Sequence, residues 1–257
     1  MKIAVCIKQV VTREWPLRVA DSAVWVRDDD ASFEMNEPDA YALEEALRLK
    51  ERHGGEVVVC SAGPARVSQV IREALARGAD RAIHVMSDVL GTGGADAVAA
   101  GLAAAMRDES FDLVLTGLQS DDQGFGQTGV VLAERLGLPH ATIIMEVDIT
   151  TTDGGGSLRV KRELESGWFQ WVTMPLPALV TIQSGINQLR YATLRGIMAA
   201  KRKPVRTVTV TEVPAPGQRI LELYVPEKES ATRLVDGPPA EAARELVRLL
   251  REEARVL

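Results

Sequence analysis

The sequence predicts an α/β fold built on a parallel β-sheet, with added antiparallel strands and a C-terminal arm that is followed by a helix. Three observations support this fold class. Short apolar runs alternate with helical apolar stripes over the first 150 residues, which is typical of a sheet covered by helices on both faces. From there to residue 190, strand-like runs follow one another without a long helical pattern. Near the C-terminus, a stretch rich in proline and glycine precedes a segment whose apolar residues recur at the spacing of an amphipathic helix.

The alternating part is predicted to contain five strands and four helices. Apolar runs predict the strands at residues 3–7, 57–60, 82–85, 113–116 and 141–147. Apolar residues at helical spacing predict the helices at 39–50, 67–75, 95–106 and 128–136, with Gly54-Gly55, Gly78 and Gly137 as stop signals. In such sheets a ligand binds beyond the carboxyl ends of the strands, near the point where the strand order reverses.

The remaining segments depart from this alternation. Residues 17–19 and 24–26 flank a short turn and predict a small hairpin. The turn signal Asp-Gly-Gly-Gly at 153–156 predicts a second hairpin. The arm and the terminal helix either pack on their own domain or wrap a partner subunit. The other predicted elements are strands at 168–172, 178–182 and 207–213, the extended arm at 214–239 and the helix at 240–257.

The composition excludes several classes of protein. Hydrophobic residues make up 46% and charged residues 26% of the 257 residues, as in ordinary globular proteins. No apolar run reaches the ~18 residues of a membrane span, so no membrane insertion is expected, and no signal peptide is expected from the N-terminal run MKIAVCIKQV. The net charge of −6 argues against nucleic-acid binding. Cys6 and Cys60 lie in apolar runs and are expected to be free thiols in a reducing compartment, the cytoplasm.

A polar, glycine-rich loop at 117–129, GLQSDDQGFGQTG, follows a predicted strand and runs into a predicted helix. Free backbone N–H groups and the dipole at a helix N-terminus suit a phosphate. Gln127 and Thr128 fall in or beside the first helical turn, and Gly124 and Gly126 allow a ligand to approach the backbone closely. The loop matches neither GxGxxG nor the P-loop pattern, so an ordinary surface loop with a helix cap is the alternative.

Two further segments point to the same edge of the sheet. In residues 35–39, MNEPD, either Asn36 or Asp39 is expected to cap the following helix, and Asn36 could also hydrogen-bond a ligand. Residues 61–64, SAGP, form another strand-to-helix turn. Loops after three predicted strands therefore converge, as a mononucleotide site requires.

Several catalytic and metal-binding patterns are missing from the sequence. It contains no HExxH, no cysteine cluster of metal spacing, no GxSxG and no Walker lysine. His53, His84 and His140 are scattered, and we expect neither a metal site nor a nucleophile–base pair. A nucleotide site without a reaction centre indicates a binding or carrier protein rather than an enzyme.

The charge distribution shows one asymmetry. Residues 166–211 contain no acidic side chain. In an acidic protein this window predicts a positive patch that steers an acidic partner or an anion; a solvated basic helix end is the alternative. Its basic residues are Arg190, Arg195, Lys201, Arg202, Lys203 and Arg206.

Segments along the whole chain carry a family resemblance. The most specific is QLRYATLRGIM at 188–198, followed by AAKRKP at 199–204. VCIKQV at 5–10, MNEPDAYALEEALRLKE at 35–51 and CSAGPARVSQVIREALARGADRAIHV at 60–85 have matching order and spacing. These segments resemble the β subunit of electron transfer flavoprotein. GLQSDDQGFGQTG, YATLRGI and LYVPEKESAT are most similar to the bacterial branch that partners trimethylamine dehydrogenase.

The resemblance implies a Rossmann-like fold of the adenine-nucleotide α-hydrolase type and a heterodimer with an α subunit. The family carries electrons from a dehydrogenase to a downstream acceptor, on an FAD held mainly by the α subunit. Residues 1–213 would bind AMP as a structural ligand, and residues 214–257 would pack on the α subunit. Carried over by position, the cofactor-binding residues are Cys6, Asn36, Glu37, Pro38, Asp39, Ala62, Gly117, Leu118, Gln119, Ser120, Asp121, Asp122, Gln123, Gly124, Phe125, Gly126, Gln127 and Thr128.

The resemblance also implies a partner-recognition loop near residues 184–204. Leu194 would enter an apolar pocket of a dehydrogenase, while Arg190 and Arg195 steer the encounter and Tyr191 lies beside them. The alternative places Leu194 in the core of a helix face.

The chain departs from parts of the family. The loop lacks the DGDTAQVGP pattern of flavin-bifurcating members, which hold a second FAD where AMP otherwise sits; this favours AMP and leaves the second FAD as an alternative. Arg13 stands where mitochondrial members place a flavin-facing tyrosine, and Trp15 is a candidate substitute. A third hypothesis is a stand-alone adenine-nucleotide-binding protein, which a lysine or histidine in the phosphate loop would support; the loop contains none.

Overall fold

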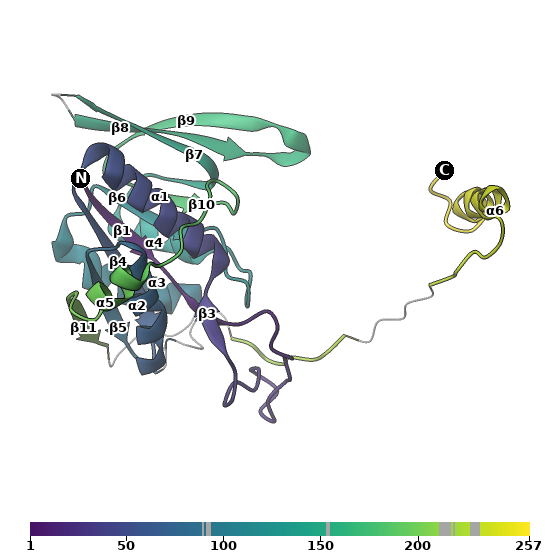
Figure 1. The fold of residues 1–257 in the computed structure, drawn as a ribbon, viewed down its shortest axis with the longest axis horizontal. Helices are drawn as coiled ribbons and strands as arrows, with labels where there is room; N and C mark the ends of the chain where they lie inside the picture. The colour runs from purple at the N-terminus through teal and green to yellow at the C-terminus, as the bar shows by residue number, and fades with distance from the viewer. Residues whose placement is uncertain (89, 91–93, 153–154, 211–216, 218, 227–231) are drawn as a thin grey trace. The chain divides into compact units, whose positions relative to one another are not determined.

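The computed structural model describes residues 1–88, 90, 94–152, 155–210, 217, 219–226 and 232–257. The chain divides into two compact units, Met1–Leu223 and Tyr224–Leu257. Within the first unit, Figure 1 shows a central sheet with helices packed against it.

This sheet has nine strands in the order β11-β5-β4-β1-β6-β10-β7-β8-β9. Neighbouring strands from β11 to β7 are parallel, and the pairs β7–β8 and β8–β9 are antiparallel. Strands β4 and β5 follow β1 outward on one side, whereas the next strand, β6, lies on the other side of β1, so the strand order reverses between β1 and β6. The bounds are β1 Lys2–Cys6, β4 Glu56–Gly63, β5 Arg81–Met86, β6 Leu113–Gly117, β7 His140–Thr152, β8 Gly155–Glu163, β9 Phe169–Pro175, β10 Ala178–Ile182 and β11 Val205–Thr209.

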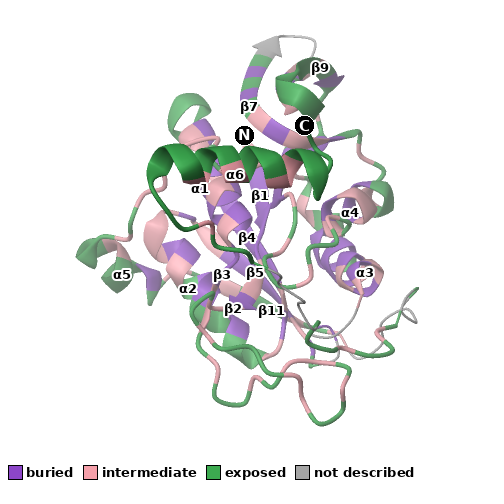
Figure 2. Ribbon diagram, turned by 90° about the vertical axis from the view of Figure 1, so that its right-hand side faces the viewer, coloured by how far each residue is buried: buried purple, intermediate pink, exposed green. Residues whose placement is uncertain are grey.

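Helices cover both faces of the sheet (Figure 2). Helices α1 (Glu37–His53), α2 (Ser68–Arg77) and α5 (Leu194–Ala200) pack on one face, and α3 (Ala95–Met106) and α4 (Thr128–Leu136) on the other. Because side chains alternate across a strand, β1 contributes to both layers. Its Ile3 and Val5 pack with α1 and α2, whereas Ala4 and Cys6 pack with α3 and α4.

These two apolar layers confirm the predicted fold class. The bounds of α3 and α4 coincide with the predicted 95–106 and 128–136. The other predicted helices and strands of the alternating part are present with shifted ends; α1, predicted at 39–50, runs from Glu37 to His53. Apolar periodicity locates an element well and its ends poorly.

Three details differ from the prediction. The short strands β2 (Gln9–Val11) and β3 (Phe33–Met35) pair antiparallel and were not anticipated, because three residues are too few to show a period. The hairpin predicted from 17–19 and 24–26 consists of one bridge between Val19 and Val26. The turn residues 153 and 154 lie outside the described residues, but β7 and β8 on either side form the predicted hairpin.

Strand β9 forms one edge of the sheet and exposes the aromatic rings of Phe169 and Trp171. Two cations from the neighbouring β8 lie over these rings. Arg159 is 4.1 Å from the centroid of Trp171, and Lys161 is 4.2 Å from that of Phe169. Both are cation–π contacts between adjacent strands.

The second unit contains the predicted terminal helix, α6 (Pro239–Glu252). Proline at its first position fits a helix start, and Arg248 pairs with Glu245 and Glu252 one turn away on either side. The predicted domain boundary after residue 213 falls among residues 211–216, which lie outside the described part of the chain. In the residues that the structure describes, no helix combines the length and the apolar character needed to cross a membrane.

Candidate functional site

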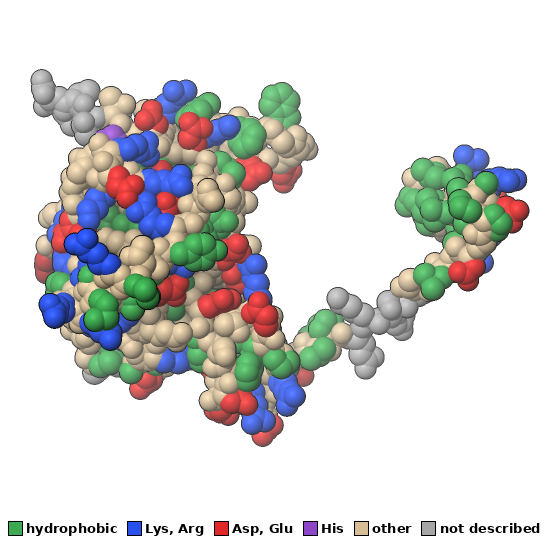
Figure 3. All heavy atoms as spheres, viewed as in Figure 1, with side chains coloured by type: hydrophobic (Ala, Val, Ile, Leu, Met, Phe, Trp, Pro, Cys, Tyr) green, Lys and Arg blue, Asp and Glu red, His purple; other side chains and the backbone are tan. Residues whose placement is uncertain are grey.

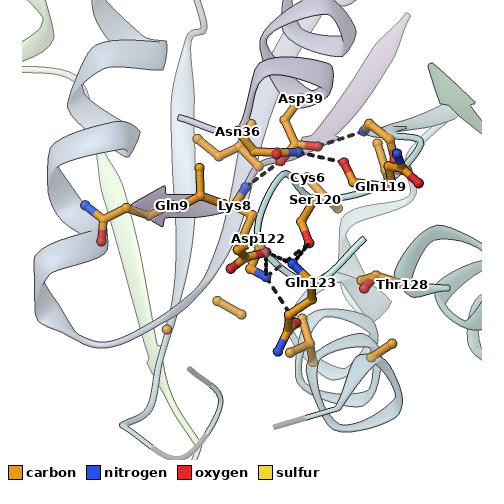
Figure 4. Close-up of a pocket in the computed structure, with 18 of the residues that line it drawn as sticks. Cys6, Lys8, Gln9, Asn36, Asp39, Gln119, Ser120, Asp122, Gln123 and Thr128 are labelled. Carbon is orange, nitrogen blue, oxygen red and sulfur yellow. Dashed lines mark hydrogen bonds and ion pairs between the residues drawn. The ribbon is translucent and has the colours of Figure 1, made fainter. Parts of the chain in front are cut away.

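A cavity opens at the carboxyl ends of β1, β4 and β6, beside the point where the strand order reverses (Figure 4). It contains about 1170 Å³ of empty space, part of which is open to solvent. The loops that the sequence predicts to converge therefore share one cavity. The predicted nucleotide-binding residues that line it are Cys6, Asn36, Asp39, Ala62, Gly117, Leu118, Gln119, Ser120, Asp122, Gln123, Phe125, Gly126, Gln127 and Thr128.

Four predicted residues, Glu37, Pro38, Asp121 and Gly124, do not line this cavity. The Asp121 carboxylate accepts a hydrogen bond from the Glu37 N–H at 3.3 Å and pairs with Arg13, also at 3.3 Å. Arg13 pairs with the Glu37 carboxylate as well. Arg13 is therefore held by one carboxylate at the start of α1 and by one from the loop after β6.

Asp39 joins the ends of β1 and β6. Its buried carboxylate accepts hydrogen bonds from the Lys8 N–H at 2.7 Å and the Gly117 N–H at 2.9 Å. Burial raises the pKa of this carboxyl to about 7, although both N–H groups favour the charged form and partly offset the shift. A side chain on Gly117 would collide with Asp39, since a Cβ there would lie 2.4 Å from a carboxylate oxygen. The floor of the cavity thus depends on this aspartate and this glycine together.

Asn36 occupies the N-cap position of α1, but its side chain makes no capping hydrogen bond. Its amide reaches the loop after β6 instead. Nδ2 donates to the Gln119 carbonyl at 3.0 Å, and Oδ1 accepts from the Asp121 N–H at 2.9 Å. The prediction that Asn36 or Asp39 caps the helix is therefore wrong, because each side chain binds backbone of another segment.

Lys8 is a cavity residue that the sequence analysis overlooks. It follows β1, and its ammonium group reaches the loop after β6, where it pairs with Asp122 at 2.6 Å. It also donates to Gln123 Oε1 at 3.2 Å and Ser120 Oγ at 3.3 Å. Figure 4 shows these groups facing one another at one wall of the cavity. The loop at 117–129 itself contains no lysine, but the end of the neighbouring strand β1 supplies Lys8. The rule that ligands bind beyond the carboxyl ends of parallel strands would have indicated this residue.

The N-terminus of α4 also borders the cavity. The side chain of its N-cap residue, Gln127, makes no capping hydrogen bond, and Thr128 is the first helical residue. The N–H groups of a first helical turn lack partners within the helix and carry partial positive charge. Gly126, just before the helix, has a φ of +64°, a conformation that glycine adopts without strain. This corner of the cavity has the features of an anion site.

The opposite part of the cavity is apolar. Leu90, Ala95, Val98 and Leu102 line it from the α3 side. Cys6 lies directly opposite Cys60 on the neighbouring strand. Its hydrogen bond with Cys60 and its burial raise the pKa of the Cys6 thiol well above the usual value, so the protonated form is strongly favoured.

An outer wall was not anticipated from the sequence. Trp25, Phe33 and Arg66 extend the cavity away from α4. The Arg66 guanidinium lies 4.2 Å from the ring centroid of Phe33 and pairs with Asp28. The insertion that interrupts the early alternation therefore contributes to the cavity.

Arg190, predicted to steer a partner, is instead bound to α1. Its side chain pairs with Glu44 at 2.7 Å and with Glu51 at 2.6 Å, and its N–H also donates to Glu44. The Glu44 side chain is only 4% exposed and receives a further hydrogen bond from Arg48. Burial acts to raise the pKa of Glu44, but the bonds from Arg190 and Arg48 outweigh it and lower the pKa. Arg190 therefore anchors the segment that precedes α5.

The residues after Arg190 are strongly exposed. Tyr191 is 89% and Leu194 85% exposed, and Ile197 and Met198 on α5 are exposed as well. Figure 3 shows hydrophobic side chains beside basic ones on the surface around α5. Leu194 is therefore not part of a helix core. It begins α5, whose N-cap Thr193 accepts a hydrogen bond from the Gly196 N–H at 3.0 Å.

The basic window is partly neutralised by acidic residues from elsewhere in the chain. Arg206 pairs with Glu109 at 3.0 Å, and Arg190 pairs with Glu44 and Glu51. Lys203 keeps its charge but is held by the carbonyls of Leu75 and Ala79, to which it donates at 2.9 and 2.6 Å. Arg195, Lys201 and Arg202 are exposed.

In the described ranges no three His, Cys, Asp or Glu side chains are grouped so that they could hold a metal ion. Nor does the cavity wall bring a serine or cysteine into contact with a histidine: His84 is buried, with Nε2 3.1 Å from the Gly63 carbonyl. The site is consequently described by its backbone N–H groups, its ion pairs and its apolar wall.

Comparison with known proteins agrees with this arrangement. Residues 24–213 match the family model of the electron transfer flavoprotein domain. The electron transfer flavoprotein subunit beta of Methylophilus methylotrophus is 36% identical over 265 residues, covering 98% of both chains. The protein of the same name from Bacillus subtilis is 37% identical, covering 90% of this chain and 91% of the relative. That from Bradyrhizobium diazoefficiens is 38% identical over the whole of both chains. This chain therefore belongs to the electron transfer flavoprotein family, as a β subunit.

Proposed function

We propose that this chain works as one half of a heterodimeric electron carrier, in which the α subunit holds most of the FAD and this chain holds a structural AMP. Electrons would pass from a dehydrogenase to the FAD and then to a downstream acceptor. The observation that carries the proposal is the cavity at the reversal point of the sheet, where the loop 117–129 meets the start of α4. The chain's own side chains make and break no bonds in this scheme.

The cavity residues fit an adenylate. The apolar wall formed by Leu90, Ala95, Val98 and Leu102 suits a purine, and the N-terminus of α4 suits one phosphate. Thr128 would donate its hydroxyl to a phosphate oxygen, with Gln127 beside it. Asn36 and Asp39 would act indirectly, because their polar atoms hold the loop and the strand ends. The remaining cavity residues would contact the ligand through backbone and apolar atoms.

The docking proposal concerns Tyr191, Leu194 and Arg195. An exposed leucine with exposed basic neighbours fits an anchor that enters an apolar pocket on a dehydrogenase while charge speeds the encounter. Burying one leucine contributes about 1.5–3 kcal/mol, which suits a complex that must dissociate after each transfer. Residues 214–257 would pack on the α subunit.

A bifurcating carrier with a second FAD in place of AMP is the second candidate, because Trp25, Phe33 and Arg66 also line the cavity and add to the wall that a larger ligand could contact. A stand-alone nucleotide-binding protein is a third. Lys8 is a cation near the loop that this third hypothesis would require for phosphate binding. Its ammonium group, however, is paired with Asp122.

Mass spectrometry of the small molecules released on denaturation separates these candidates. We expect AMP from the purified chain, and one FAD per heterodimer once the α subunit is added. Two FAD molecules per heterodimer and no AMP would establish the bifurcating type. Combining Thr128→Val with Gln127→Ala should lower the AMP content, and unchanged AMP would overturn the phosphate assignment.

A further inference from the structure

The loop after β6 lines the cavity and is held to the rest of the protein by several contacts, among them two ties from Asn36 and Lys8. Asn36, at the N-cap of α1, holds the backbone of Gln119 and Asp121. Lys8, at the end of β1, holds the next part of the loop through Ser120, Asp122 and Gln123. The bonds of Lys8 join side chain to side chain, so they can break while the strands stay folded.

The tie between Lys8 and Asp122 is an ion pair in a partly buried setting. Their side chains are 34% and 25% exposed, and their charged atoms are 2.6 Å apart. Burial acts to raise the pKa of Asp122, but the Lys8 charge together with the hydrogen bonds from Lys8, Ser120 and Gln123 outweighs it and lowers the pKa, so Asp122 is ionised at neutral pH. The same carboxylate oxygen accepts the Gln123 N–H at 2.6 Å, which couples the ion pair to the loop backbone.

The position of the pair gives it a consequence for a ligand. In the sequence, residues 120–123 lie between Gly117 and the anion corner at Gly126 to Thr128, and Ser120, Asp122 and Gln123 line the cavity. A nucleotide seated in the cavity would therefore lie against this part of the loop. The pair also cancels one positive charge against one negative charge, so Lys8 can hold the loop without drawing a phosphate away from α4.

We propose that Lys8 is a positioning residue of the nucleotide site, and that its pairing with Asp122 fixes the loop and sets how long the nucleotide is retained. This inference rests on the proposed adenylate site and adds a residue and a role to it. It separates two functions within the cavity: the start of α4 binds the phosphate, and the pair between β1 and the loop slows its release.

The test measures release of AMP from the full-length chain after loading with AMP and rapid dilution. Lys8→Met, Asp122→Asn and the double variant are compared with wild type. Because each single variant removes a charge-assisted hydrogen bond that holds the loop, each should release AMP about tenfold faster. The double variant should be no faster than the singles, since both remove the same interaction. Lys8→Arg should restore slow release.

A matched control exists in the pair Lys50–Asp80, which also has a 2.6 Å contact and similar exposure but lies outside the cavity. Lys50→Met should leave AMP release unchanged. Chymotrypsin gives a readout without nucleotide: cleavage after Phe125, in the loop, should accelerate in Lys8→Met relative to cleavage after the exposed Tyr191.

The outcomes are distinguishable. If wild type retains AMP and Lys8→Met retains it equally well with unchanged cleavage at Phe125, the role of Lys8 is refuted and the adenylate site stands. Additive effects in the double variant refute the pairing with Asp122. If the wild-type chain neither contains nor takes up AMP, both the proposed adenylate site and the proposed role of Lys8 are refuted.

Discussion

Helix α1 carries three buried carboxylates. Two of them, Asp39 in the first turn and Glu44 five residues later, have pKa values that shift in opposite directions. Asp39 is met by neutral backbone N–H groups, and its pKa is raised to about 7. Glu44 is met by the guanidinium groups of Arg190 and Arg48, and its pKa is lowered. Two N–H dipoles offset only part of the pKa rise that burial causes, whereas full positive charges on neighbouring arginines turn that rise into a decrease. The first arrangement shapes the cavity; the second holds the segment that presents Leu194.

The largest expected effect comes from removing the first carboxylate. Asp39→Ala leaves the N–H groups of Lys8 and Gly117 buried without their acceptor, so the free energy of unfolding should fall by about 3 kcal/mol. Urea denaturation measures this loss. Asp108→Ala, at an exposed position, is the control and should change stability by less than about 0.5 kcal/mol. A loss as small as the control's would mean that Asp39 does not hold the strand ends together.

The pH dependence sharpens the same comparison. An acid whose folded pKa lies above its unfolded value binds extra protons when folded, so its contribution to stability falls as pH rises. For Asp39 this window extends from the ordinary value of 3.8 to about 7. We expect wild type to lose stability relative to Asp39→Asn between pH 4 and 7. Parallel stability curves for the two proteins would contradict the raised pKa.

Glu44 should show the opposite sign and a smaller change. Its lowered pKa stabilises the fold above the ordinary value of 4.5, and that contribution is lost as pH falls through the lowered value. Glu44→Gln keeps one acceptor for Arg190 and Arg48 but removes the charge, so about 1 kcal/mol should be lost at pH 7. Amide exchange should also quicken at residues 187–193. Glu51→Gln, which removes only an exposed partner of Arg190, is the matched control.

The smallest effect on stability is expected at Leu194. Because its side chain is 85% exposed, Leu194→Ala should change the free energy of unfolding by less than about 0.5 kcal/mol. Electron transfer from the partner dehydrogenase should nevertheless slow, with unchanged flavin content. Stopped-flow reduction of the flavin measures this rate. An unchanged rate would remove Leu194 from the docking proposal.

The fold could be predicted because its elements follow local patterns. The stripes of α3 and α4 lie between clear start and stop signals, and their bounds match the prediction. Strands β2 and β3 could not be found this way, since their pairing depends on residues about 25 positions apart and each has only three residues. Convergence of the loops after β1, β4 and β6 followed from the topology of parallel sheets rather than from any one motif.

The sequence indicated where loops would converge, but it did not indicate which side chains would bind one another. Asn36 and Asp39 line the cavity and Arg190 precedes α5, and the side chains of all three bind other parts of the protein. These partners lie 31 to 146 residues away in the chain, and no local pattern reports such pairing. Lys8 was missed for the same reason, because its partner Asp122 belongs to another loop.

The open edge at β9 bears on how the isolated polypeptide behaves in solution. Unpaired backbone groups on an outermost strand invite another copy to add its own strand, above all where large rings are displayed. Here Arg159 and Lys161 spread positive charge across Trp171 and Phe169, so two such rims repel before their backbones can meet. The cations stacked on the two rings therefore disfavour self-association through this edge.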